Sequence, residues 1–138
     1  RTYAQRKAWV ESHHDPYAVF VTTVPATDAA TEGGERIIGF SALSVFYDRA
    51  GYDGVTDLAY YIAPEWQGRG AGTFTLAKLL DECRNRHMRK ACGIIIADNR
   101  GSIALMKHFG FTQFGLMPQG ATDSTGTMRD MSYWHLDL

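Results

Sequence analysis

In the segment Tyr60-Tyr61-Ile62-Ala63-Pro64-Glu65-Trp66-Gln67-Gly68-Arg69-Gly70-Ala71-Gly72, a strand pattern stops at a proline and three glycines follow at alternate positions. An amphipathic run begins at Thr73 and predicts a helix after the glycines. Glycines let the backbone turn tightly and expose its N–H groups. The helix adds unpaired N-terminal amides and the positive end of its dipole. Such a loop binds a phosphate or pyrophosphate through the backbone alone, so the sequence predicts a phosphorylated ligand.

The size and composition of the chain are those of an ordinary globular protein. Its 138 residues predict one domain over residues 1–138. Apolar residues make up 45% and charged residues 21%. The net charge of −1 gives no electrostatic support for a nucleic-acid partner. No apolar run reaches the roughly 20 residues that a spanning helix needs, so no membrane partner is expected.

The cysteines and histidines show no spacing typical of a metal site or a disulfide framework. Cys83 falls in a predicted helix and Cys92 in a predicted strand, while His13-His14 are adjacent and the other histidines are scattered. No metal is therefore expected. Two such thiols are typical of a reducing compartment, which predicts the cytoplasm.

Hydrophobic periodicity and turn residues predict six strands and three helices. The predicted strands are 18–24, 36–45, 55–63, 90–97, 112–117 and 127–136, and the predicted helices are 2–13, 73–87 and 102–109. A hairpin loop is predicted over 26–35 and an irregular segment over 47–54. The order indicates a mixed α/β sheet with one central strand–loop–helix unit.

Three nucleotide-binding patterns compete for the glycine loop. A P-loop needs Gly-x-x-x-x-Gly-Lys, and no such lysine is present. A dinucleotide fold needs Gly-x-Gly-x-x-Gly, whereas the spacing here is Gly-x-Gly-x-Gly. The run 67–72 instead resembles the Arg/Gln-x-x-Gly-x-Gly/Ala signature of the GNAT acetyltransferases, which hold the coenzyme A pyrophosphate. Residues 98–102 and then 109–111 resemble the next motif of that family at the expected distance.

Four further segments resemble one branch of that family, the phosphinothricin and methionine sulfoximine N-acetyltransferases. These segments are 49–53, 57–62, 126–130 and 134–137. The resemblance implies a mostly antiparallel central sheet with helices on both faces, splayed at the coenzyme site. It implies acetyl transfer from acetyl-CoA to the amine of a small amino-acid-like substrate by a homodimer. The family also carries a strand and a helix before the position of Arg1, so we expect sequence upstream of it.

The resemblance also implies a set of coenzyme-binding residues. They are Ile62, Gln67, Gly68, Arg69, Gly70, Ala71, Gly72, Asn99 and Ser102. In the family a strand bulge frees a backbone N–H that polarises the thioester carbonyl, and the matching positions are Tyr61 and Ile62. Asn99 and Ser102 are expected to hydrogen-bond the pantetheine or to cap the following helix.

Asp57 stands where family members carry an acidic residue, commonly Glu, and is the candidate general base, acting directly or through a water. The alternatives are a solvated carboxylate at a strand end, or Asp53 as the base. Arg49 and Tyr52 match the segment that faces the acceptor, where Arg49 suits a carboxylate.

Two departures from the family pattern bear on activity and substrate. Met106 occupies a position where many members have Tyr or His, so the leaving thiolate would be protonated by solvent or by the product amine. Met106, together with Asp57 in place of Glu, leaves a second possibility open: an acyl-CoA-binding module or sensor without turnover. The polar stretch 120–125 differs from the more apolar or basic stretch of the branch, which leaves the acceptor itself undefined.

Overall fold

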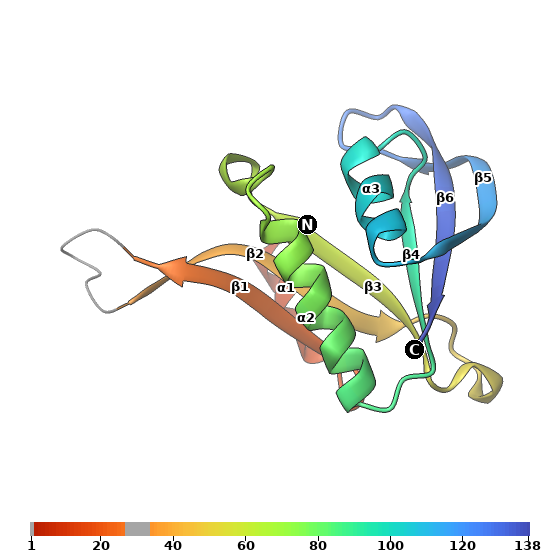
Figure 1. Ribbon diagram of the computed structural model, residues 1–138, viewed down its shortest axis with the longest axis horizontal. Coiled ribbons are helices and arrows are strands. Elements are labelled where there is room, and N and C mark those ends of the chain that lie inside the picture. The colour runs from red at the N-terminus through yellow and green to blue at the C-terminus, as the bar shows by residue number, and fades with distance from the viewer. Residues whose placement is uncertain (1, 27–33) are drawn as a thin grey trace.

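The computed structural model describes residues 2–26 and 34–138, which form one six-stranded sheet and three α-helices (Figure 1). The elements are α1 (Tyr3–Glu11), β1 (Ala18–Pro25), β2 (Glu35–Val45), η2 (Ala50–Tyr52), β3 (Val55–Ile62), η3 (Pro64–Trp66), α2 (Ala71–Asn85), β4 (Lys90–Ile96), α3 (Arg100–His108), β5 (Thr112–Thr122) and β6 (Met128–Asp137). The strand order in the sheet is β1-β2-β3-β4-β6-β5.

Every neighbouring pair of strands is antiparallel except β3 and β4, which run parallel. These two strands pair only from Val55 to Leu58 against Lys90 to Gly93. Beyond these residues they separate, as Figure 1 shows for the green and teal strands. The mostly antiparallel, splayed sheet predicted from the sequence is confirmed.

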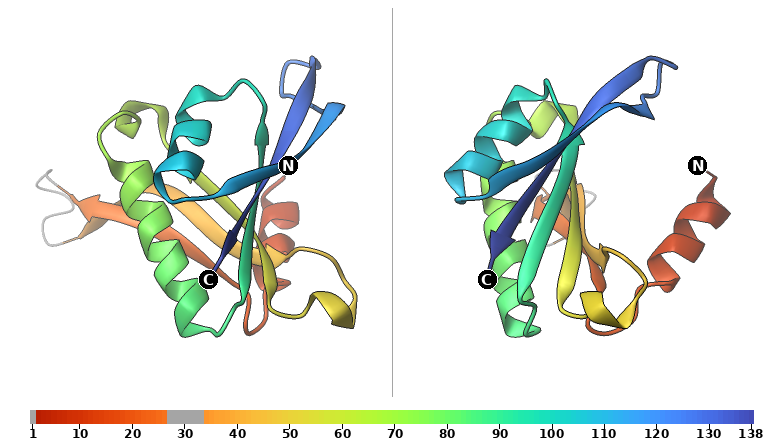
Figure 2. Two further views of the ribbon diagram at one scale, coloured as in Figure 1. Left: turned by 45° about the vertical axis from the view of Figure 1, so that its right-hand side comes forward. Right: turned by 90° about the vertical axis from the view of Figure 1, so that its right-hand side faces the viewer.

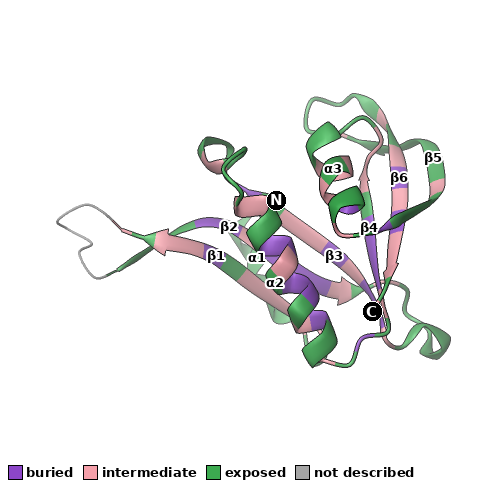
Figure 3. Cartoon of the chain, in the orientation of Figure 1, coloured by how far each residue is buried: buried purple, intermediate pink, exposed green. Residues whose placement is uncertain are grey.

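Helices lie on both faces of the sheet, with α2 and α3 on one face and α1 on the other (Figure 2). The core lies under α2, where Leu76, Leu79 and Cys83 pack against Leu43 and Leu58 of the sheet (Figure 3). Burial of each such leucine contributes roughly 1.5–3 kcal/mol.

No residue of the helix α1 is fully buried. Contacts of individual side chains hold the helix against the sheet. His13 Nε2 lies 2.8 Å from Ser44 Oγ, and the Trp9 ring packs edge-on against Phe40 at 6.3 Å between centroids. These two contacts determine which face of α1 lies against the sheet.

Element boundaries differ from the predicted ones where a cap or a strand partner decides them. The helix α2 begins at Ala71 rather than Thr73, because Gly70 takes the left-handed conformation before it. Of the two residues expected to cap α3 or to bind the pantetheine, Asn99 is the cap, and its side chain accepts the Ser102 N–H at 3.1 Å. The strand β5 runs on to Thr122, into the polar stretch, because β6 pairs with it there. The predicted loop 26–35 lies mostly outside the described residues.

Candidate active site

The separation of β3 from β4 opens two adjoining cavities. The first, here called the coenzyme cavity, has a volume of about 300 Å³. It is lined by Tyr60, Tyr61, Ile62, Gln67, Gly68, Gly72, Asn99, Gly101, Ser102 and Leu105. The second, here called the strand gap, has about 330 Å³ and is lined by Asp57, Leu58, Ala59, Tyr60, Ile94, Ile95, Ile96, Asn99, Ser102 and Met131. Tyr60, Asn99 and Ser102 line both.

The glycine loop takes a conformation that only glycine adopts readily. Gly68 has φ 74° and Gly70 has φ 86°, and nothing lies within 4 Å of where a side chain would begin at either position. Gln67 braces the loop, because its Nε2 donates to the Ile62 carbonyl at 2.9 Å. The Arg69 guanidinium lies over the Trp66 ring at 5.1 Å. The loop thus presents backbone and open space rather than side chains.

Two helix N-termini border the coenzyme cavity. The first turn of α2 carries no acidic residue, and Gly72 of that turn lines the cavity. The N-terminal residues Asn99, Gly101 and Ser102 of α3 line the other side. Exposed helix amides and two positive dipole ends favour an anion, so the residues present suit a pyrophosphate-bearing ligand.

Asp57 is a carboxylate held away from water. Its Oδ1 atom is buried and has no hydrogen-bond partner among the described residues, and burial raises its pKa to about 6. Desolvation disfavours the charged form of a carboxylate, which is the cause of this shift. Asp53, the alternative base, is exposed and lines neither cavity.

Asp57 also borders a third space, here called the α1 cavity, of about 560 Å³ between α1 and the sheet. It is lined by Arg6, Trp9, Val10, Val19, Val21, Phe40, Ser44, Asp57 and Ala59. Arg6, Trp9 and Val10 share one helix face because they are spaced three and four residues apart. Asp57 therefore stands in the wall between the α1 cavity and the strand gap.

The structure does not bring every predicted site residue to this place. Arg49 is exposed, and its guanidinium lies 5.8 Å from the Tyr47 ring centroid. Tyr52 lines an apolar hollow with Cys92 and His135, apart from the cavities that Asp57 borders. Of the coenzyme residues, Arg69, Gly70 and Ala71 lie in the loop and helix start without lining the coenzyme cavity.

The strand bulge implied at Tyr61 and Ile62 is not present. The register between β2 and β3 is unbroken from Ser44 opposite Asp57 to Gly39 opposite Ile62. Backbone groups on the β4 side of 59–62 are instead left unpaired by β4 because that strand diverges after Gly93. The splay therefore leaves backbone groups of 59–62 without a partner on β4.

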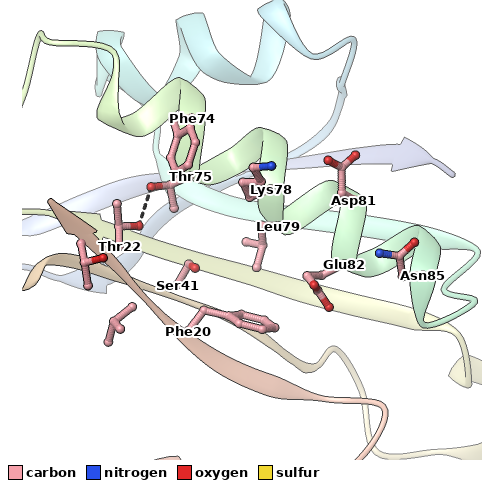
Figure 4. A pocket seen from close by; sticks show the side chains of 12 residues that line it. Phe20, Thr22, Ser41, Phe74, Thr75, Lys78, Leu79, Asp81, Glu82 and Asn85 are labelled. Carbon is pink, nitrogen blue, oxygen red and sulfur yellow. Dashed lines mark hydrogen bonds between the residues drawn. The ribbon is translucent and has the colours of Figure 1, made fainter. Parts of the chain in front are cut away.

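A cavity of about 430 Å³ lies elsewhere, between β1 and α2 (Figure 4). Its lining includes Phe20, Lys78 and Glu82, and a hydrogen bond of 2.7 Å joins Thr22 to Thr75 across it. It contains none of the predicted site residues and lacks the paired helix N-termini of the coenzyme cavity. We therefore place the active site at the splay.

The model of the acetyltransferase (GNAT) family matches residues 2–111, most of the chain and all of the splay. The chain belongs to the acetyltransferase (GNAT) family. Two curated relatives in this GNAT family illustrate the match. The chain is 26% identical over 136 residues to the L-methionine sulfoximine/L-methionine sulfone acetyltransferase of Pseudomonas aeruginosa, covering 98% of this chain and 74% of that protein. It is 30% identical over 116 residues to the phosphinothricin N-acetyltransferase of Streptomyces coelicolor, covering 83% and 64%.

A solved GNAT structure agrees with the fold. A GNAT superfamily phosphinothricin acetyltransferase from Sinorhizobium meliloti, in complex with acetyl-CoA, superposes with a TM-score of 0.76 at 26% identity. The match covers 98% of this chain and 67% of that one. The predicted family and enzyme class are confirmed, and this GNAT chain is an acetyl-CoA-dependent acetyltransferase.

Among residues 2–26 and 34–138, no three His, Cys, Asp or Glu side chains gather into a group that could hold a metal ion. No helix in the described part of the chain combines the length and apolarity needed to cross a membrane.

Proposed function

We propose that this GNAT chain moves the acetyl group of acetyl-CoA to the amine of a small amino-acid-like acceptor. One observation carries the proposal: Asp57, whose half-buried carboxylate has one buried oxygen with no hydrogen-bond partner among the described residues, stands between the strand gap and the α1 cavity. The names of the relatives, which include methionine sulfoximine and phosphinothricin acetyltransferases, support the acceptor class.

In this proposal the glycine loop and the two helix N-termini hold the coenzyme. The backbone of 67–72 binds the pyrophosphate, with Asn99 and Ser102 beside the pantetheine arm in the strand gap. Unpaired backbone donors of 61–62 polarise the thioester carbonyl, a kind of contact that contributes a few kcal/mol to a transition state. Asp57 accepts the proton of the acceptor ammonium from the α1 side, directly or through a water.

The acceptor's carboxylate has two candidate partners. The resemblance assigns it to Arg49, with Tyr52 nearby. The geometry supports Arg6, because Arg6 lines the α1 cavity together with Asp57 and forms no ion pair within the described residues. Trp9 and Phe40 form an apolar wall between the two ends of that cavity. We therefore propose Arg6 as the anion contact and test it against Arg49 below.

A binding module without turnover is the second class that the sequence left open. Asp57 favours the enzyme, because a carboxylate that borders both cavities, with a pKa raised to about 6 by desolvation, is suited to take a proton near neutral pH. The homodimer stays a prediction from the resemblance, and the cytoplasmic location stays a prediction from the two cysteines. An exposed apolar surface suited to a subunit contact lies at Phe114, which packs against Tyr133 and His135.

The test is release of free coenzyme A from acetyl-CoA in the presence of an acceptor panel. The panel contains free amino acids, their carboxamides, methionine sulfoximine, phosphinothricin, polyamines and hydroxylamine. We expect turnover with free amino-acid-like acceptors and N-acetylated products by mass spectrometry. Tight coenzyme binding without thiol release for any amine would support the binding module instead, and a preference for polyamines would overturn the acceptor class.

A further inference from the structure

The helix α3 offers no proton donor to the coenzyme at position 106. Met106 is 1% exposed and packs in the core, with its sulfur against Gly93 of β4. A thioether has no proton to give. A donor for the leaving thiolate must therefore be another residue, the product amine or water.

Tyr60 on β3 lies where such a donor is needed. Leu58, Tyr60 and Ile62 alternate along the strand and share the face that α2 and α3 cover. Tyr60 comes after the last residue that pairs with β4, so its side chain enters the splay. It lines both the coenzyme cavity and the strand gap.

The Tyr60 hydroxyl is buried and has no hydrogen-bond partner among the described residues. Buried polar groups are nearly always paired in folded proteins, so a hydroxyl without a protein partner that borders both cavities is suited to contact a ligand bound there. Ser102 on α3 is the neighbouring polar side chain.

Few other groups at the splay can exchange a proton. In the strand gap the titratable side chains are Asp57 and Tyr60. The coenzyme cavity adds Tyr61, whose ring instead stacks on Phe40 at 5.6 Å, on the α1 face. Tyr60 is thus the titratable side chain that both cavities share.

We propose that the Tyr60 hydroxyl protonates the coenzyme A thiolate as it leaves. The proposal rests on the proposed acetyl transfer. Asp57 first takes one proton from the acceptor ammonium and releases it to water. The amine nitrogen then forms a bond to the thioester carbon, and Asp57 takes the second proton that the nitrogen loses. The carbon–sulfur bond then breaks, sulfur keeps the electron pair, and the phenolic proton moves to sulfur. Water returns a proton to the phenolate while Asp57 releases one, so both side chains recover their starting state.

The surroundings of Tyr60 keep it in the form that this role requires. Burial raises the pKa of Tyr60, and the Ser102 side chain opposes part of this rise. The phenol is therefore protonated at neutral pH, as an acid must be before it acts.

The first test compares Tyr60→Phe with the parent, using hydroxylamine as well as an amino acid as acceptor. Loss of a general acid typically lowers the rate by about 10²–10⁴-fold, so we expect kcat to fall by this factor while coenzyme affinity by calorimetry stays within about threefold. The matched control is Tyr133→Phe, which removes a hydroxyl from the opposite face of the sheet, next to Met117. It should leave kcat unchanged.

The second test replaces acetyl-CoA with its selenoester analogue, whose selenolate leaves without needing a proton. We expect the selenoester to restore most of the lost rate in Tyr60→Phe, and to give little gain in the parent. An equal loss on both donors would overturn the proposal, because the hydroxyl would then act on binding or on the carbonyl. So would a Tyr60→Phe enzyme as fast as the parent. An inactive parent with every amine, by contrast, would refute the proposed function itself.

Discussion

Asp57 and Tyr60 stand three residues apart on β3, so their side chains point to opposite faces of the sheet, yet both border the strand gap. Asp57 also faces the α1 cavity, and Tyr60 also faces the coenzyme cavity. An amine entering from the α1 side meets the carboxylate, while a thiol leaving on the α2 and α3 side meets the phenol. One strand thus presents a proton acceptor and a proton donor to the two sides of one reaction.

The buried charge of Asp57 has a cost in stability that depends on pH. Its pKa is about 6 in the folded protein against a reference value of 3.8. Because the folded state binds this proton more tightly, the penalty is absent below pH 4, grows between pH 4 and 6, and is complete above pH 6. About two pKa units correspond to roughly 3 kcal/mol, an upper bound.

Asp57→Asn should therefore raise the free energy of unfolding relative to the parent by about 1–3 kcal/mol at pH 8, with the difference shrinking toward pH 4. Urea unfolding of both proteins at several pH values measures this difference in the free energy of unfolding. The comparison isolates Asp57, because the two proteins share all their other titratable groups. A difference that stays constant with pH would show that the carboxylate is solvated when folded.

The glycine loop should be sensitive to a single methyl group. Gly68→Ala places a side chain in the open space that lines the coenzyme cavity, where the pyrophosphate must approach. Loss of one contact to a charged group is worth about 1.5–3 kcal/mol, or roughly 10–150-fold in affinity for acetyl-CoA by calorimetry.

Gly126→Ala is the control for this change. Gly126 has φ 84°, close to the φ of Gly68, and open space around it, but it lies in the turn between β5 and β6. Both variants carry the same left-handed strain, about 1–2 kcal/mol. Equal coenzyme affinity in the two variants would show that the loop does not contact the coenzyme through this position.

Arg6 should read the acceptor's carboxylate. Arg6→Gln removes the charge at the α1 cavity, and a charge-assisted pair is worth about 1.5–3 kcal/mol, so kcat/KM should fall roughly 10–150-fold on free amino acids. Their carboxamides should be affected little. Lys7→Gln is the control on the same helix, because Lys7 pairs with Glu11 and does not line the cavity. A selective loss on acids in Arg49→Gln, and none in Arg6→Gln, would return the role to Arg49.

Much of the fold and the glycine loop could be predicted because their signals are local. The positive φ angles of Gly68 and Gly70 are a property of those residues alone, and the motif at 98–102 marks the start of α3 in the same way. Asp57 was found through the resemblance, because it stands where family members carry an acidic residue.

Tyr60 and Arg6 were missed because tertiary placement decides their roles. A signal for Tyr60 was present: it shares the period of two with Leu58 and Ile62, which places a hydroxyl on the buried face of β3. Arg6 gave no such signal, since contacts of Trp9 and His13 with the sheet decide where α1 lies. The extent of β5 likewise depends on pairing with β6, which no window of local sequence contains.

The dependence of kcat/KM on pH, measured for the parent and Asp57→Asn with one amino-acid acceptor, tests the central claim most directly. The parent should rise to a plateau with an apparent pKa near 6, because Asp57 must be ionised to accept the amine's proton. Asp57→Asn should be about 10²–10⁴-fold slower at pH 7. The kcat/KM of Asp57→Asn should keep rising with pH, with no plateau above pH 6, until the acceptor ammonium has lost its proton in solution. Matching profiles and rates in the two proteins would contradict the assignment of Asp57 as the base.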